Sequence, residues 1–147
     1  MPSLPRRLVL LLLAMETPLF AAASIKVTIA SDSTACTYGS NEARGRRGWG
    51  EILPEFLSSN VVIDNQAASG RSSKSFIDEG RWAGCLAANA NYYFIQFAHN
   101  DSKTSDPALG TDPQTTYKAN LIKFVTESRA QGGKPVFLTP PTRRNFS

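Results

Sequence analysis

Apolar residues along the chain follow two spacings, one typical of strands and one typical of helices. Four short runs rich in β-branched and aromatic residues predict strands at Ile25–Ala30, Val61–Asp64, Tyr92–Phe97 and Pro135–Leu138. The third run is apolar at almost every position, which is typical of a strand buried on both faces. The sequence therefore predicts a sheet with four strands.

Three segments between these runs carry apolar residues at helical spacing. They cover Gly48–Ser58, Ser75–Ala88 with an interruption at Gly80, and Tyr117–Ser128 with a stop at Gly132-Gly133. Strands that alternate with helical crossovers predict an α/β fold with a doubly wound parallel sheet. In such sheets ligands bind beyond the carboxyl ends of the strands.

The first 23 residues have the layout of a secretory signal peptide. Arg6 and Arg7 precede the apolar run Leu8–Ala14, and Ala21-Ala22-Ala23 offers small residues for cleavage. The apolar run is too short to span a bilayer. We therefore expect a secreted, extracellular protein with no membrane anchor, in which residues 24–147 form one domain.

Composition and charge exclude several classes of protein. Sixteen basic and twelve acidic residues give a net charge of +4, and the basic residues form no stripe suited to a phosphate backbone, so we expect no nucleic acid partner. One histidine and two cysteines do not supply a zinc site, and we expect a monomer without metal or cofactor. Cys36 and Cys85 permit one disulfide in a secreted protein, and the sequence leaves their pairing open.

Residues suited to acyl transfer follow the first three predicted strands. Ser33, within Asp32-Ser33-Thr34, could act as a nucleophile, although the same residues also form Asx turns and helix caps. Gly70 lies at the next strand-to-helix turn, where backbone amides can approach an oxyanion; an ordinary tight turn is the alternative.

The third strand is followed by His99, Asn100 and Asp101, which open a polar loop that runs to Pro113. The Asn100 side chain is a neutral hydrogen-bond donor suited to an oxyanion, or else a partner for loop backbone. A lone histidine such as His99 more often makes a structural hydrogen bond than it acts as a catalyst.

Taken in order, these three segments resemble the blocks of the SGNH (GDSL-like) hydrolases. Four further segments of this sequence resemble the rhamnogalacturonan acetylesterase branch of that family. They are Gly70-Arg71-Ser72-Ser73-Lys74-Ser75-Phe76, Glu79-Gly80-Arg81-Trp82, Gly48-Trp49-Gly50 and Arg143-Arg144-Asn145-Phe146. The resemblance covers nearly all of Ile25–Phe146 and implies a flavodoxin-like fold, with four of about five strands present.

The resemblance implies a role for individual residues. Ser33 would be the nucleophile, and its own N–H, the Gly70 N–H and the Asn100 side chain would form the oxyanion hole. Asp32, His99 and Asp101 would support this site. The residues implied for substrate binding are Arg71, Ser73, Arg81 and Trp82.

Two N-glycosylation sequons begin at Asn100 and Asn145. Because the oxyanion role would bury Asn100, we expect that site to be unglycosylated. Two other positions depart from the family pattern: Ser31 and Ala98 stand where the family usually has glycine. Either residue would strain the site if its backbone position required a positive φ.

The late Asp-x-x-His of the family, which supplies the general base and its orienting carboxylate, does not occur in the 147 residues. His99 could replace that base only within about 3 Å of the Ser33 hydroxyl. We therefore expect a C-terminally truncated chain with an exposed edge strand and part of an apolar face uncovered.

Two functional interpretations remain open at this point. One is a secreted carbohydrate esterase that removes O-acetyl groups from a plant cell-wall polysaccharide such as rhamnogalacturonan, contributing to pectin degradation. The other is a catalytically dead fragment or a non-catalytic carbohydrate-binding remnant that keeps a groove lined by Arg71, Arg81 and Trp82.

Overall fold

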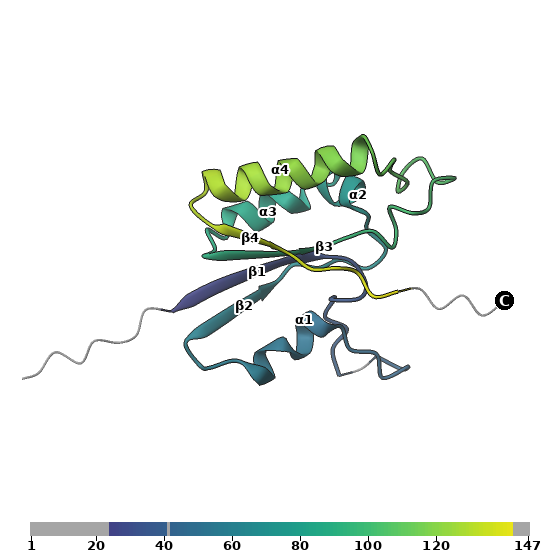
Figure 1. Ribbon diagram of the computed structural model, residues 1–147. Coiled ribbons are helices and arrows are strands. Elements are labelled where there is room, and N and C mark those ends of the chain that lie inside the picture. The colour runs from purple at the N-terminus through teal and green to yellow at the C-terminus, as the bar shows by residue number, and fades with distance from the viewer. Residues whose placement is uncertain (1–23, 41, 143–147) are drawn as a thin grey trace, which may run out of the picture.

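Four parallel strands form one sheet in the computed structural model, which describes residues 24–40 and 42–142 (Figure 1). The sheet order is β2-β1-β3-β4. The strands are β1 (Ile25–Ser31), β2 (Val61–Asn65), β3 (Tyr92–Gln96) and β4 (Lys134–Phe137). All four predicted strands are present, and the carboxyl ends of the inner strands lie level because Ser31 pairs with Gln96.

Helices cover both faces of the sheet, which confirms the doubly wound α/β prediction (Figure 1). Helix α1 (Trp49–Ile52) and the short 3₁₀ helix η1 (Leu53–Phe56) lie on one face. The other face carries α2 (Ser73–Asp78), α3 (Arg81–Ala87) and α4 (Thr116–Ala130). Among the described residues, no helix is long and apolar enough to cross a membrane.

The single helix predicted over Gly48–Ser58 is wrong. Pro54 has no N–H to donate to the carbonyl four residues earlier, so the α-helical bonding stops after one turn and η1 follows. As a result Phe56 points to solvent and is 78% exposed.

The helical pattern over Ser75–Ala88 divides into two helices at Gly80. Gly80 has φ +73°, a left-handed conformation that ends the run of helical backbone and precedes α3. Helix α2 begins earlier than predicted because Ser72 caps it: the Ser72 hydroxyl accepts from the Ser75 N–H, and the Ser75 hydroxyl accepts from the Ser72 N–H.

The core lies between the sheet and the layer of α2, α3 and α4, and it is built from aromatic rings. Phe76, Tyr93 and Phe124 are fully buried, and Trp82 is 2% exposed. The Trp82 ring centroid lies 4.7 Å from that of Phe124 and 5.7 Å from that of Tyr93, both edge-on. This packing fixes the sheet face beneath α2–α4 and the strand ends that carry the site.

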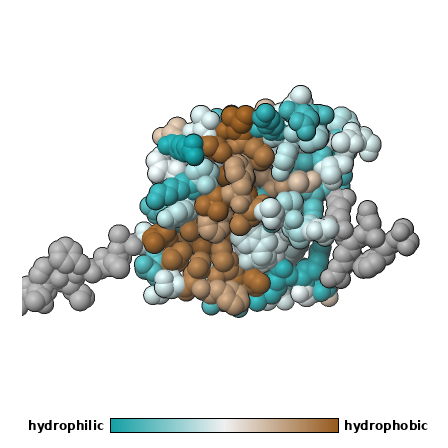
Figure 2. Space-filling view, in the orientation of Figure 1, coloured by the Kyte–Doolittle hydropathy of each residue, from teal (hydrophilic) through white to brown (hydrophobic). Residues whose placement is uncertain are grey.

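The opposite face of the sheet is only partly covered. Tyr92 and Phe94 of β3 are half-buried, so the prediction that this strand is buried on both faces is wrong. They line an apolar groove of about 300 Å³, here called the sheet groove, together with Val27, Leu53, Leu57 and Val136. Figure 2 shows apolar side chains gathered in a band that runs from the level of α4 to that of η1.

Strand β4 lies at the outer edge of the described sheet, and its Phe137 side chain is 44% exposed. The described residues thus show the exposed edge strand and the partly uncovered apolar face that the sequence predicted.

Candidate active site

The segments that follow β1, β2 and β3 are joined by hydrogen bonds at the carboxyl edge of the sheet. The Ala68 N–H donates to the Ser31 carbonyl at 2.9 Å, which ties the segment after β2 to the end of β1. The Asn100 side-chain amide donates to the Arg71 carbonyl at 2.9 Å, which ties the segment after β3 to the turn at Gly70. The three predicted blocks therefore meet at one edge, as the strand order requires.

Residues 32–35, here called the nucleophile turn, are held by hydrogen bonds from several elements. The Asp32 carboxylate is buried and accepts from the Thr34 N–H and the Thr34 hydroxyl, each at 2.9 Å, so the Asx-turn interpretation holds. The three following carbonyls each accept from a different donor. The Ser33 carbonyl accepts from the Tyr38 hydroxyl at 2.9 Å, and the Thr34 carbonyl accepts from the Trp49 backbone N–H at 2.9 Å. The Ala35 carbonyl accepts from the Asn65 side-chain amide at 2.8 Å.

Two glycines explain how α1 approaches this turn so closely. A Cβ on Gly48 would collide with the Cys36 carbonyl oxygen, and one on Gly50 would lie 2.7 Å from the Ala35 carbonyl oxygen. Because Gly48 and Gly50 have no side chain, the backbone of α1 can pack directly against the turn that carries Ser33.

Ser33 itself is half-buried, and none of the residues 24–40 and 42–142, His99 included, makes a hydrogen bond to its hydroxyl. The His99 ring instead places Nε2 at the Pro141 carbonyl oxygen, in the segment after β4. This contact is the structural hydrogen bond that a lone histidine more often makes.

The turn after β2 offers backbone amides to solvent at Gly70. Gly70 has φ +78° and is exposed, which is the left-handed conformation that favours glycine. The neighbouring Asn100 is only 6% exposed, and one hydrogen of its side-chain amide is donated to the Arg71 carbonyl. Its second amide hydrogen is the group able to donate to an oxyanion.

Asp101 connects the start of α2 to the loop after β3. Its carboxylate accepts from the Ser73 N–H at 3.1 Å, the Ser73 hydroxyl at 2.5 Å and the Thr111 hydroxyl at 3.1 Å. Burial raises the pKa of Asp101, and the hydrogen bonds from Ser73 and Thr111 oppose that shift. Ser73 is fully buried in this contact, so it supports the loop and is not placed to touch a substrate.

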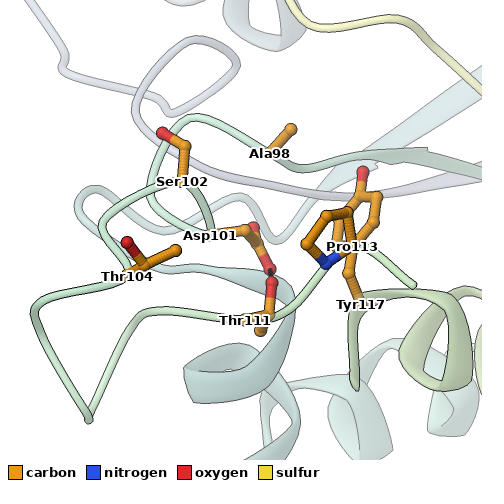
Figure 3. Close-up of a pocket in the computed structure, with 7 residues that line it drawn as sticks. All are labelled: Ala98, Asp101, Ser102, Thr104, Thr111, Pro113 and Tyr117. Carbon is orange, nitrogen blue, oxygen red and sulfur yellow. Dashed lines mark hydrogen bonds between the residues drawn. The ribbon is translucent and has the colours of Figure 1, made fainter. Parts of the chain in front are cut away.

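A pocket of about 300 Å³ opens beside this loop, with Ala98 on one side and Pro113 and Tyr117 on another. Figure 3 shows Asp101 and Thr111 pointing toward one another there, joined by their hydrogen bond. The pocket has mainly apolar walls and borders the segment that carries Asn100.

The residues expected to bind substrate divide between surface and core. Arg71 and Arg81 each form an ion pair with Glu79, at 3.0 and 2.6 Å, on the exposed surface after the Gly70 turn. Hydrogen bonds from Arg81 and then Arg71 lower the pKa of Glu79. Trp82 is different: its ring is in the core and its indole N–H donates to Glu127 at 2.7 Å, so it lines no surface groove.

The two positions that depart from the family pattern behave differently. Ser31 has no positive φ, and its buried hydroxyl donates to the Gln96 carbonyl at 2.8 Å. Ala98 has φ +149°, which places backbone strain one residue before His99. The expected strain therefore applies at Ala98 and not at Ser31.

Gln96 is the polar residue that the sequence interpretation missed. Its side-chain oxygen accepts from the Thr34 hydroxyl at 2.7 Å and from the Trp49 indole N–H at 2.8 Å. Its side-chain amide donates to the Thr139 carbonyl at 2.9 Å. The signal was a single polar residue inside an otherwise apolar strand.

The two cysteines do not form a disulfide. Cys36 is half-buried after the nucleophile turn, and Cys85 is fully buried in α3. Burial, with a smaller contribution from Asp64, raises the pKa of the Cys85 thiol to about 12. Three predictions lie outside the described residues: the signal peptide over Met1–Ala23, the run Arg143-Arg144-Asn145-Phe146 and the sequon at Asn145.

Comparison with known proteins gives one family and several relatives. The model of the GDSL-like lipase/acylhydrolase family matches residues 32–147. The probable rhamnogalacturonan acetylesterase YesY of Bacillus subtilis is 36% identical over 122 residues, which cover 82% of this chain and 55% of the relative. The rhamnogalacturonan acetylesterase RhgT of the same organism is 36% identical over 124 residues, covering 83% and 51%. The chain thus spans about half the length of these curated relatives.

Solved structures show the same fold. The Bacillus subtilis protein YxiM superposes with a TM-score of 0.68 at 21% identity, covering 80% of this chain and 33% of that one. A catalytic mutant of an acetylxylan esterase from Geobacillus stearothermophilus superposes with a TM-score of 0.63 at 17% identity, covering 78% and 59%.

Proposed function

This chain belongs to the GDSL-like lipase/acylhydrolase family, and from that premise we propose that it removes O-acetyl groups from rhamnogalacturonan with Ser33 as the nucleophile. The nucleophile turn carries the proposal. Hydrogen bonds hold three successive carbonyls of that turn, and the Ser33 hydroxyl is not engaged by the described residues. Two relatives of 36% identity that are named for this polysaccharide support the choice of substrate.

The proposed reaction has two steps. Ser33 Oγ attacks the acetyl carbonyl carbon, and the resulting oxyanion accepts hydrogen bonds from the N–H groups of Ser33 and Gly70 and from the Asn100 amide. The carbonyl re-forms as the bond to the sugar oxygen breaks, and that oxygen takes up the proton that the base removed from Ser33. This leaves acetyl-Ser33 and a free sugar hydroxyl. Water then attacks acetyl-Ser33 and releases acetate.

A base must accept the Ser33 proton in the first step. The 147 residues contain one histidine and no Asp-x-x-His, and that histidine contacts the Pro141 carbonyl oxygen. Serine sites that lack one member of the triad retain roughly 10³–10⁴-fold catalysis over water through binding and the oxyanion hole. We therefore expect the chain by itself to react slowly and to respond to an added base.

Imidazole supplies that base in a test with the full chain. We expect acetate release from acetylated rhamnogalacturonan to exceed the Ser33→Ala control, and the difference to grow at least about tenfold when imidazole is added. The Ser33→Ala variant measures the reaction of imidazole itself with the substrate. Equal rates for the two proteins, with and without imidazole, would reject the esterase proposal for this chain.

A second candidate function is binding of the polysaccharide without catalysis. It is favoured by the guanidinium groups of Arg71 and Arg81 at the Gly70 turn. Calorimetry with rhamnogalacturonan oligosaccharides separates the two functions. Heat of binding that Ser33→Ala retains, together with no Ser33-dependent acetate release, would support binding alone.

Secretion, the monomeric state and the unmodified Asn100 are part of the same proposal. The layout of Met1–Ala23 supports secretion, and the 6% exposure of Asn100 supports the absence of a glycan there. N-terminal sequencing of exported protein, sedimentation analysis and peptide mapping test the three statements. A mature chain that still begins at Met1, a dimer, or a glycan on Asn100 would contradict them in turn.

A further inference from the structure

Gln96 occupies the last position of β3, between the nucleophile turn and the segment after β4. It is 6% exposed, and both polar atoms of its side chain are used. The side-chain oxygen accepts from Thr34 and Trp49, and the side-chain nitrogen donates to the Thr139 carbonyl. One amide thus contacts three separate parts of the carboxyl edge.

Its orientation is fixed by these partners. The Trp49 indole N–H can only donate, and the Thr139 carbonyl can only accept. A flipped amide would place donor against donor at Trp49 and acceptor against acceptor at Thr139. The oxygen of Gln96 is therefore held toward the nucleophile turn.

The Thr34 hydroxyl makes this turn sensitive to Gln96. It lies 2.7 Å from the Gln96 side-chain oxygen and 2.9 Å from the Asp32 carboxylate, and both of these are acceptors. The hydroxyl has one hydrogen to share between them. The position of Thr34, and with it that of the adjoining Ser33, depends on the balance between the two acceptors.

The segment after β4 is held from the same strand end. Gln96 binds the Thr139 carbonyl and His99 contacts the Pro141 carbonyl. A displacement of this segment would shift the Gln96 amide, and the shifted amide would change the position of the Thr34 hydroxyl that donates to it.

We propose that Gln96 is a positioning residue for Ser33 and that its amide couples the nucleophile turn to the segment 139–141. The inference rests on the proposed function only in taking Ser33 as the nucleophile. A residue that merely stabilised the fold would lower stability when replaced, without a specific effect on Ser33 or on the coupling.

Acylation of the full chain by p-nitrophenyl acetate in the presence of imidazole tests the positioning. We expect Gln96→Leu to slow the Ser33-dependent rate at saturating substrate roughly ten- to hundredfold, with KM little changed, because a small displacement of an attacking group has effects of that size. Gln96→Glu keeps an oxygen for Trp49 and Thr34 and should recover part of the rate. Thr28→Val, which removes a buried hydroxyl in the middle of β1 that bonds to Asp64 and to no residue of the nucleophile turn, is the control and should react like the wild-type chain.

Nuclear magnetic resonance tests the coupling without any need for activity. We expect Thr34→Val to shift the amide resonances of Leu138 and Thr139 in the wild-type background and to leave them unchanged in the Gln96→Leu background. A wild-type acylation rate in folded Gln96→Leu, or equal shifts in both backgrounds, would overturn the inference. No Ser33-dependent acylation of the wild-type chain would instead overturn the proposed function, and the resonance shifts would still decide the coupling.

Discussion

Ala98 holds a backbone conformation that suits glycine better than any other residue. Its φ of +149° lies where a Cβ is strained, at a cost of about 1–3 kcal/mol. We expect Ala98→Gly to raise the free energy of unfolding by about 1 kcal/mol, since the loss of strain exceeds the greater entropy of glycine in the unfolded chain. Urea denaturation measures the change.

Ala88 provides the matched control for that substitution. It is the C-cap residue after α3 and has φ −69°, an ordinary helical value, so Ala88→Gly should lower the free energy of unfolding, by at most about 1 kcal/mol. If both variants were destabilised alike, Ala98 would carry no relievable strain.

The two thiols should differ sharply in reactivity. Only a thiolate is alkylated readily, and Cys85 stays protonated at pH 8 because burial raises its pKa to about 12. Cys36 is half-buried and free. Mass spectrometry after native iodoacetamide treatment should find one modified cysteine, Cys36, and two after unfolding; native modification of Cys85 would contradict its placement in the core.

Residues that act through their immediate sequence neighbours were the ones that the sequence could identify. Asp32 and Ser33 belong to a local turn that directly follows a strand, and the left-handed turn at Gly70 is a property of its own backbone. Gln96 acts through partners 43 to 62 residues away, and no local pattern contains that information. Trp82 was misplaced because a tryptophan in a polar run does not reveal which way its helix faces.

The contact between α2 and the loop after β3 depends on the Asp101 carboxylate. Asp101→Ala would leave the Ser73 N–H and the Thr111 hydroxyl buried without an acceptor, and we expect a loss of about 3 kcal/mol in the free energy of unfolding. Asp101→Asn keeps one oxygen for these donors and should cost less than about 1 kcal/mol at pH 4 and below. Urea denaturation of the two variants checks the difference.

The same carboxylate predicts a pH dependence. Because burial raises the pKa of Asp101 above its unfolded value, the folded chain holds that proton more tightly, and its contribution to stability is lost as pH rises from the ordinary aspartate range through the raised pKa. Asp101→Asn lacks this titration. Its stability relative to the wild-type chain should therefore improve between pH 3 and pH 7, and a constant or worsening difference would contradict the burial argument.

At the level of whole elements, strands were predicted more faithfully than helices. Each strand is a short apolar run that is followed by turn residues. The observed strand ends therefore lie within one residue of the predicted ones. The helix expected at Gly48–Ser58 failed because apolar spacing does not register the missing N–H of Pro54. The interruption predicted at Gly80 is confirmed, because the left-handed backbone of that residue separates α2 from α3.

The described part of the molecule is asymmetric, with α2, α3 and α4 over one sheet face and α1, η1 and the sheet groove on the other. An apolar groove open to solvent should bind anilinonaphthalene sulfonate (ANS) in the native state. We expect Leu57→Lys, at the rim of the groove, to reduce ANS fluorescence at least about twofold. Ile122→Lys on α4 is the control, because Ile122 is 56% exposed and does not line the groove; equal loss in both would place the dye elsewhere.

The fold brings to one edge the three groups that an acyl transfer requires first: a fixed serine turn, a left-handed glycine turn and an asparagine amide. The hydrogen bond from the Asn100 amide to the Arg71 carbonyl and those that hold the carbonyls around Ser33 are the basis on which we propose an esterase reaction for this chain. Their order along the sequence predicted that edge, while the mutual support of the turns needed the structure.

Locating the acetyl group after reaction shows directly whether Ser33 is the nucleophile. The full chain is incubated with p-nitrophenyl acetate and imidazole, quenched in acid and digested, and the modified residue is identified by tandem mass spectrometry. We expect acetyl on Ser33 in the wild-type chain and none in the corresponding peptide of Ser33→Ala. Acetyl found only on Cys36 or on lysines, with Ser33 unmodified, would contradict it.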